Sequence, residues 1–157
     1  MNSERHLLIP KIESGIVIDH VPAGLGAGIL ELLRSYAGLD DAQITLGLNY
    51  DSNKLGRKDM LKIIAPELPK KVLAHLSILA SGVTIKRVDN YRVQGKYSLQ
   101  PPDHIEGLAR CINPNCISNH ERQASARFTR LGETSHKFRC AYCERVFELD
   151  ELDIVLP

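Results

Sequence analysis

The spacing of apolar residues changes several times along the first part of the chain. Residues 15–19 form a short β-branched run that is typical of a strand. Within 25–36 the apolar side chains recur every three or four positions, which predicts a helix, and Gly38 provides its stop. Two further strands are predicted at 43–48 and 58–64, on either side of a polar turn.

The same alternation of strand and helix patterns continues to residue 93. Pro69 is placed to open a second helix that Gly82 closes, and residues 83–93 are predicted to form one last strand. The resulting order, βαββαβ, predicts an α+β domain of the ferredoxin-like type, with one antiparallel sheet and two helices on one face. The apolar run 7–9 is a candidate for an additional edge strand.

The pattern changes after residue 93. Pro101 and Pro102 stand in succession within 95–103 and cannot continue a helix or a central strand, so we place a linker there. Between 110 and 154 there is no helical period, only short apolar runs, which indicates a small antiparallel sheet. We therefore expect two domains, 1–100 and 103–157.

All four cysteines lie in this second domain, as two short pairs. Four residues separate Cys111 from Cys116, two separate Cys140 from Cys143, and 23 residues lie between the pairs. Such spacings are typical of four-thiolate zinc sites, which are structural because no position remains for a catalytic water. A domain of about 50 residues buries too little surface to be stable alone, and zinc would supply the missing stability. We predict one structural Zn²⁺ per chain.

Two disulfides, or four unrelated thiols, are the alternative interpretation of these cysteines. Disulfides belong to oxidising compartments, and the polar N-terminus shows no apolar signal sequence. No apolar run approaches the roughly 18 residues that a membrane span needs. We therefore expect reduced thiols, a cytoplasmic location and no membrane partner. His120 and His136 lie near the pairs and could replace a sulfur, although four cysteines already complete a tetrahedron.

Charge distinguishes the two predicted domains. The formal net charge of the chain is +1, but residues 103–157 hold 7 Lys and Arg residues against 9 Asp and Glu residues, and zinc held by four thiolates makes them more negative. Zinc domains that bind nucleic acid depend on a positive face that contacts phosphates. The basic residues of 103–157 could still share one face, so a nucleic-acid-binding zinc ribbon is the alternative function.

The glycines at 24, 26 and 28 follow a predicted strand and open a predicted helix. Phosphate-binding loops occur at such positions, because the first N–H groups of a helix are free to bind an anion. The spacing lacks the third glycine of the dinucleotide-binding fingerprint, and no Walker lysine follows. Close packing of the helix is therefore the favoured interpretation.

Charged residues near the predicted strands are candidates for ligand binding. Asp19 and His20 end the first strand, where they point to opposite faces unless the chain kinks, so they are a ligand-binding pair or surface polar groups and not a catalytic unit. Lys58 and Lys62 share one strand face, with a methionine between them, and Lys96 follows the last strand. Converging lysines beside a carboxylate could hold the phosphates and ribose of a nucleotide.

Several segments, spread over nearly the whole chain, form a highly specific set. They are 15–22 (GIVIDHVP), 44–49 (ITLGLN), 56–63 (GRKDMLKI), 87–93 (RVDNYRV) and the two cysteine pairs. In this order, they resemble the regulatory chain of aspartate carbamoyltransferase. The resemblance implies a non-catalytic allosteric subunit that dimerises through its N-terminal domain and joins catalytic trimers into a holoenzyme through its zinc domain, which contacts the catalytic chain.

The resemblance also implies a nucleotide site in the N-terminal domain. In this family the site binds CTP, the feedback inhibitor of pyrimidine biosynthesis, and ATP as an activator, with UTP acting beside CTP in some members. By motif match, the base would meet backbone near Ile12 and Tyr91, while Asp19 and Lys62 would hold the ribose and the base edge. The phosphates and the rest of the pocket would be contacted by Lys96, His20, Val17, Lys58, Val88 and Val93.

Two departures from the family pattern bear on effector preference. Pro10 stands where the family has an acidic residue near the start of the chain, which alters the edge that reads the base amino group. Lys86 stands where the family has an asparagine, just before the RVDNY segment, and adds a cation near the site. Neither departure touches the implied fold or assembly.

Overall fold

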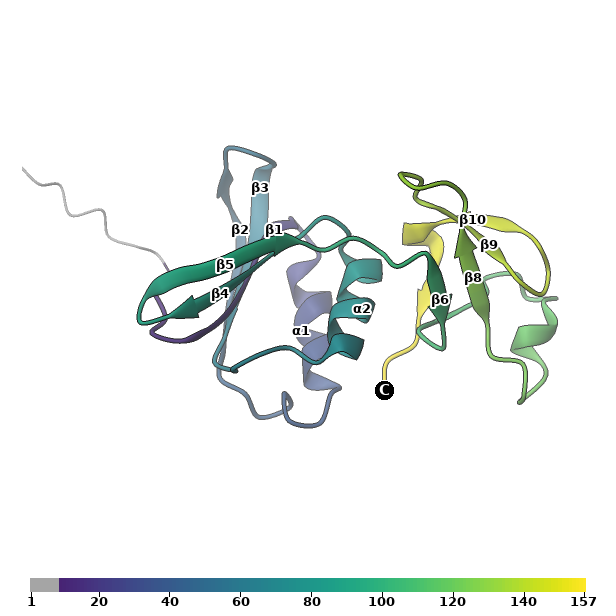
Figure 1. Cartoon of the computed structure of the whole chain (residues 1–157), viewed down its shortest axis with the longest axis horizontal. Helices are drawn as coiled ribbons and strands as arrows, with labels where there is room; N and C mark the ends of the chain where they lie inside the picture. The colour runs from purple at the N-terminus through teal and green to yellow at the C-terminus, as the bar shows by residue number, and fades with distance from the viewer. Residues whose placement is uncertain (1–8) are drawn as a thin grey trace, which may run out of the picture.

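The computed structural model describes residues 9–157. Its N-terminal domain is one antiparallel sheet in the order β2-β3-β1-β4-β5, with both helices on one face (Figure 1). The prediction of an α+β, ferredoxin-like βαββαβ order is confirmed, with β5 as an added edge strand. The elements are β1 (Gly15–Pro22), α1 (Gly26–Arg34), β2 (Ile44–Ser52), β3 (Gly56–Ile63), α2 (Lys70–Leu79), β4 (Thr84–Asp89) and β5 (Arg92–Ser98).

The two faces of the sheet have different surroundings. Successive side chains along each strand point to opposite faces, so neighbouring residues of one strand meet different neighbours. On β1, Ile16 and Ile18 join the core that packs against α1 and α2. Val17 and Asp19 point to the opposite face, yet they too are buried, at 7% and 3% exposure. Something other than helices therefore covers the second face of the central strand.

The last predicted strand, 83–93, is wrong as a single strand. The structure divides it into β4 and β5, which pair in a hairpin. Asn90 and Tyr91 form the turn, and both have positive φ, at 48° and 62°. Tight hairpin turns require such angles, and asparagine tolerates them better than most residues. The Asp89–Asn90 dipeptide is typical of a turn, but the strand-like residues on both sides of it favoured one continuous strand.

The linker is shorter than predicted at its start. β5 runs to Ser98, and Leu99 is buried in the N-terminal core, so only the residues around Pro101 and Pro102 connect the domains. The edge strand predicted at 7–9 lies mostly outside the described residues, and Ile9 forms a bend. No helix in the described range 9–157 is long and apolar enough to cross a membrane.

The C-terminal domain is built from short antiparallel strands, as the sequence predicted. One sheet has the order β10-β9-β8-β6, and a smaller one pairs β11 with β7. Phe128 and Phe138 lie at its centre and are almost fully buried. The elements are β6 (His104–Glu106), β7 (Ala109–Arg110), η1 (Ile117–Asn119), β8 (Arg127–Arg130), β9 (Lys137–Cys140), β10 (Val146–Glu148), η2 (Leu149–Glu151) and β11 (Asp153–Ile154).

Helix α2 belongs to both hydrophobic cores. Its Leu76 packs in the N-terminal core, whereas Ile78 is a member of the C-terminal core, and the helices lie between the N-terminal sheet and the C-terminal domain (Figure 1). His75 on the same helix is 1% exposed and its Nδ1 contacts the hydroxyl of Tyr36. Burial lowers the pKa of His75, so the imidazole is held neutral at this junction. The two domains therefore pack against one shared helix.

The start of α1 is held by a buried carboxylate. Asp59 Oδ2 accepts hydrogen bonds from the N–H groups of Gly24 and Gly26, at 3.0 and 2.8 Å, and Oδ1 accepts one from Asn49 at 2.8 Å. The place that a phosphate would take at this helix N-terminus is thus filled from within the chain. Close packing is confirmed for Gly26 alone, because a Cβ on Gly24 would meet nothing within 4 Å and one on Gly28 would make only ordinary contact.

Gly26 and Gly28 form a matched pair for testing this packing. A Cβ on Gly26 would lie 2.9 Å from Asp59, whereas one on Gly28 would meet nothing closer than 3.9 Å. We expect Gly26→Ala to lower the free energy of unfolding by about 2 kcal/mol through overpacking. Gly28→Ala should raise it by about 0.5 kcal/mol, because alanine favours a helix interior. Urea unfolding of both variants measures the difference, and equal effects would contradict the contact.

Candidate functional site

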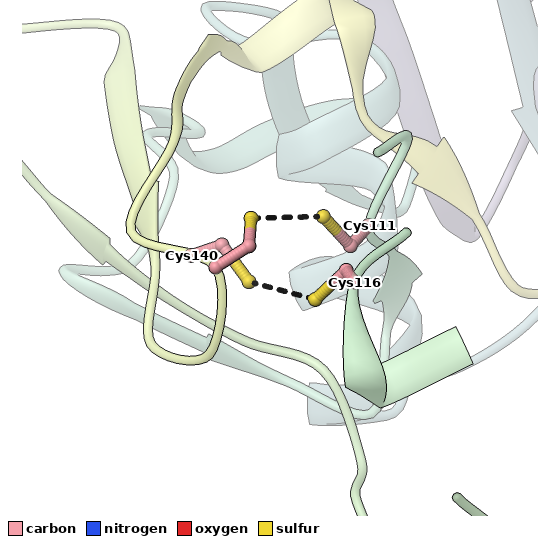
Figure 2. A group of neighbouring side chains, drawn as sticks. Cys111, Cys116 and Cys140 are labelled. Atoms are coloured by element: carbon pink, nitrogen blue, oxygen red, sulfur yellow. Dashed lines mark hydrogen bonds between the residues drawn. The ribbon is translucent and has the colours of Figure 1, made fainter. Parts of the chain in front are cut away.

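The four cysteines come together on two loops of the C-terminal domain, and Cys111, Cys116 and Cys140 are part of its hydrophobic core. The first loop lies between β7 and η1, and Asn119 Nδ2 closes it by donating to the carbonyls of Cys111 and Asn113, at 2.8 and 2.9 Å. The second loop follows β9, and Glu144, at a φ of 62°, turns the chain so that its N–H donates to the Cys140 carbonyl at 2.9 Å. Figure 2 shows the two loops presenting their sulfurs to each other.

The spacing of the sulfurs fits a tetrahedral zinc ion. All four Sγ atoms lie within 4.8 Å of one another. The pair Cys111–Cys143 is 3.7 Å apart and the pair Cys116–Cys140 is 3.8 Å apart. Four sulfurs at about 2.3 Å from one zinc ion are separated by about 3.8 Å, whereas a disulfide needs about 2.05 Å. The arrangement therefore fits one metal ion and does not fit two disulfides.

The surroundings of these thiols also suit a metal. Burial raises the pKa of Cys111 and of Cys140. Burial has the same effect on Cys143, but hydrogen bonds that include those to the Arg145 backbone and the Asn113 side chain outweigh it and lower the pKa of Cys143 to about 7. Several buried thiols release their protons together only when a cation stabilises the thiolates.

Other groups near the cysteines are engaged elsewhere. The Nε2 atom of His120 lies 2.7 Å from the Pro114 carbonyl. Among the described residues, the group of possible metal ligands consists of the four cysteines and does not include His120. Among the basic residues, Arg127 stacks over Tyr142 at 5.5 Å and Arg130 packs on Phe138 at 5.9 Å. These two side chains therefore make contacts within their own domain.

A second candidate site lies on the sheet face opposite the helices. It is a cavity of about 290 Å³, close to the lower end of the range of small-molecule pockets. The side chains around this cavity, Lys62 and Lys86 among them, flank Val17 and Asp19 on the outer face of β1. Of the residues that the family resemblance implies, it gathers Ile12, Val17, Asp19, Lys62, Val88, Tyr91 and Val93.

Strand register brings the charged groups of this cavity together. Val17 on β1 lies opposite Lys62 on β3 and opposite Lys86 on β4, so both lysines flank the central strand on one face. Asp19 lies two residues further along β1 and is ion-paired on both sides. Its Oδ1 accepts from Lys58 Nζ at 2.8 Å, and its Oδ2 accepts from Lys86 Nζ at 2.9 Å.

Asp19 is thus a buried counterion, and not a surface group. Burial alone would raise the pKa of its carboxyl, but the hydrogen bonds from Lys58 and Lys86 outweigh this and hold the pKa well below its usual range. Lys62 is less fully neutralised. Its Nζ donates to the Pro10 carbonyl at 2.6 Å, and burial lowers its pKa. Among the described residues no carboxylate forms an ion pair with Lys62, so its positive charge is left for an anionic ligand.

The structure does not place three of the implied residues on the cavity wall. Lys58 reaches the site only through Asp19. His20 has a φ of 56° at a bulge of β1, its N–H donates to Asp19 Oδ1 at 2.7 Å, and its ring contacts Thr84. The kink that an Asp19–His20 unit requires is therefore present. Lys96 pairs in register with Lys86 and so shares its face of the sheet.

Three cavity residues were missing from the implied set. Met60 follows from the two-residue period, because it lies between Lys58 and Lys62 on one strand face. Lys86 stands out in the sequence as a departure from the family pattern, but its bond to Asp19 depends on strand pairing. Lys11 precedes the first strand, β1. Outside a strand or helix there is no periodic pattern from which the direction of its side chain could be predicted.

Comparison with known proteins identifies the family of the chain. The model of the aspartate carbamoyltransferase regulatory chain, allosteric domain, matches residues 7–100, and the model of its metal-binding domain matches residues 103–153. The chain belongs to the aspartate carbamoyltransferase regulatory chain family. It is accordingly a non-catalytic regulatory subunit, with a role in the control of pyrimidine biosynthesis and with a metal-binding domain whose four clustered cysteines suit a structural zinc.

Relatives from distant organisms match over almost their whole length. The regulatory chain of Serratia marcescens is 42% identical over 150 residues, covering 94% of this chain and 95% of the relative. That of Pyrococcus abyssi is 37% identical over 146 residues, covering 93% and 95%. That of Halobacterium salinarum is 37% identical over 157 residues, covering 100% and 99%. The family assignment thus extends over both domains.

The buried ion pairs of Asp19 can be tested against an exposed pair. Asp19→Asn keeps the shape of the side chain but leaves two lysines without a counterion, so we expect the free energy of unfolding to fall by about 2 kcal/mol. Asp51 forms a comparable pair with Arg57 at 3.1 Å, but both side chains are mostly exposed. Asp51→Asn should cost less than about 0.5 kcal/mol. Urea unfolding compares the two, and similar losses would show that the Asp19 pairs do not stabilise the fold.

Proposed function

We propose that this chain binds CTP and ATP in the cavity of its N-terminal domain and transmits their binding to a catalytic chain through its zinc domain. UTP is included as an effector that acts beside CTP. The observation that carries the proposal is the convergence of Asp19, Lys62 and Lys86 with apolar side chains in one cavity on the sheet. A positively charged pocket with apolar walls suits a nucleoside triphosphate.

The cavity offers separate regions for the parts of a nucleotide. Val17, Val88 and Val93 supply apolar surface for a base, and Tyr91 is 57% exposed at the hairpin turn, where an aromatic ring can contact a base. The backbone around Ile12 and Tyr91 would read the base edge, while Asp19 and Lys62 would hold the ribose. The phosphates would then lie toward Lys86 and Lys96, with His20 nearby and Lys58 holding Asp19 in place.

In the C-terminal domain, Cys111, Cys116, Cys140 and Cys143 would hold the zinc ion. The ion supplies only structural stabilisation there, because four protein ligands leave no open position. Apolar side chains face solvent beside the ligand loops: Ile112 on the first loop, Ile117 at the start of η1 and Val146 at the start of β10, at 42%, 53% and 43% exposure. Apolar residues on rigid loops suit a protein interface, so we assign this surface to the catalytic chain.

Dimerisation would use the N-terminal domain. Within the described residues β2 has a neighbour on one side only, so its other edge has backbone groups free to pair. Leu48 on this strand is 52% exposed. The opposite edge strand, β5, is exposed along its length and carries Arg92 and Lys96. Like charges oppose pairing of two copies of β5, so a two-fold contact through β2 is favoured.

The path between the two sites runs through the shared helix. The cavity lies on one face of β1, α2 packs on the other face through the core, and Ile78 of α2 enters the C-terminal core. A nucleotide that binds one arrangement of the domains more tightly shifts the population toward it, typically with about 1–3 kcal/mol of coupling.

Assembly with a catalytic subunit tests both the role of the chain and that of its zinc. We expect the purified chain to form a complex with aspartate carbamoyltransferase catalytic trimers, seen by sedimentation, and to make their rate sensitive to CTP. Stripping zinc with a mercurial should release the chain while the catalytic rate persists, because the interface loops lose their shape. An intact complex after verified loss of zinc would contradict the assigned role of the metal.

Lys62 provides the test of the nucleotide site. Lys62→Ala removes an ammonium from the cavity, so CTP inhibition of the assembled complex should be lost, with at least a tenfold weaker affinity for CTP (about 1.4 kcal/mol). Sedimentation of the complex should be unchanged. Lys70→Ala, on the exposed start of α2 beyond the sheet, is the matched control and should leave inhibition intact. Normal inhibition of Lys62→Ala at saturating CTP would exclude this cavity as the effector site.

A further inference from the structure

We infer that Gly47, on the edge strand β2, is a positioning residue for the cavity of the N-terminal domain. Because Gly47 has no side chain, Ile9 can pack against the strand at this point. Ile9 begins the crossing segment, residues 9–13, which forms part of the cavity wall. The inference rests on the proposed nucleotide function. It concerns a residue that is not among those lining the cavity and that acts on the ligand only through the crossing segment.

Gly47 lies on the face of the sheet that carries the cavity. Strand register pairs it with Met60 on β3, which lines the cavity. Residues directly opposite each other on neighbouring strands point to the same face. The adjacent pair, Leu46 and Leu61, packs with the core on the helix side. A side chain at position 47 would therefore point outward, toward the cavity face.

The space that such a side chain would need is already occupied. A Cβ on Gly47 would clash with Cδ1 of Ile9 and would lie 2.7 Å from Cε2 of Tyr50. Glycine within a strand often marks the close approach of another part of the chain. Tyr50 is held within β2, whereas Ile9 lies outside the helices and strands, so Ile9 is the side chain that an alanine at position 47 would displace.

The crossing segment is tied to the sheet at three points. Ile9 packs on β2, and the carbonyl of Pro10 accepts a hydrogen bond from Lys62 Nζ on β3 at 2.6 Å. The carbonyl of Glu13 accepts one from the Tyr91 N–H, in the turn between β4 and β5, at 2.9 Å. The segment thus runs over the outer face of the sheet from one edge strand to the opposite hairpin.

This segment contributes directly to the cavity. Its Lys11 and Ile12 line the wall, so it supplies an ammonium group and apolar surface. Its Pro10 carbonyl also holds the ammonium of Lys62. If Ile9 loses its place on β2, the end of the segment next to Lys62 is released. A ligand must then order this wall as it binds, and the cost of ordering weakens its affinity.

Calorimetric titration of the zinc-loaded, full-length chain with CTP tests the inference. We expect Gly47→Ala to weaken CTP binding about tenfold, because the added Cβ displaces Ile9. Gly95→Ala, on β5, is the matched control and should bind CTP like the parent, since a Cβ on Gly95 would meet nothing within 4 Å. Equal affinities of Gly47→Ala and the parent would overturn the inference alone. An absence of binding to the parent would overturn the proposed function as well.

A double-mutant cycle separates positioning from a general loss of structure. Ile9→Ala removes the other half of the contact and leaves β2 unchanged, so it should also weaken CTP binding about tenfold, even if Gly47→Ala folds poorly. The variant with both changes should bind no more weakly than either single variant, because both act on one contact. Losses that multiply to about a hundredfold would show that Gly47 does not act through Ile9 and would overturn the inference.

Inhibition of the assembled complex distinguishes affinity from transmission. With catalytic trimers bound, the CTP concentration for half-maximal inhibition should rise about tenfold in Gly47→Ala, while the maximal inhibition stays that of the parent. The complex should sediment like the parent complex, because the zinc domain is not changed. A reduced maximal inhibition with an unchanged half-maximal concentration would place the role of Gly47 in transmission and would overturn its role in positioning the cavity.

Discussion

The burial of β1 on both faces is the constraint on which the rest of the molecule depends. On one face, Ile16 and Ile18 pack against the helices and form the core. On the other, Val17 and Asp19 are covered by the walls of a charged cavity. One strand therefore anchors the hydrophobic core and the candidate effector site, separated by no more than the thickness of the sheet. A ligand that moves this strand must also move the core.

Helix α2 extends this connection to the second domain. It packs on the core side of the sheet and also contributes Ile78 to the C-terminal core, while the buried His75 lies between Tyr36 and the backbone of Leu108 and Val155. The domains are therefore joined by packing as well as by the short proline linker. A contiguous packed route of this kind can carry coupling between distant sites.

The two domains stabilise their buried ionisable side chains in different ways. In the N-terminal domain Asp19 is held between lysines, so the carboxylate stays ionised and the site keeps an excess of positive charge. In the C-terminal domain four cysteines present sulfurs to one point, where only a cation can stabilise them as thiolates. The first arrangement leaves charge for a ligand, whereas the second is closed. This difference separates a candidate binding site from a structural centre.

Local patterns in the sequence were enough to determine the element order as far as β4, the shared face of Lys58 and Lys62 on β3, and the grouping of the cysteines. Periodicity and ligand spacing act within short stretches of chain, so these features can be read without the fold. Tertiary structure alone decided the bond of Lys86 to Asp19 and the filling of the α1 N-terminus by Asp59. It also decided the sharing of α2 between two cores. These features depend on strand register and domain packing, which join residues far apart in the chain and leave no local pattern.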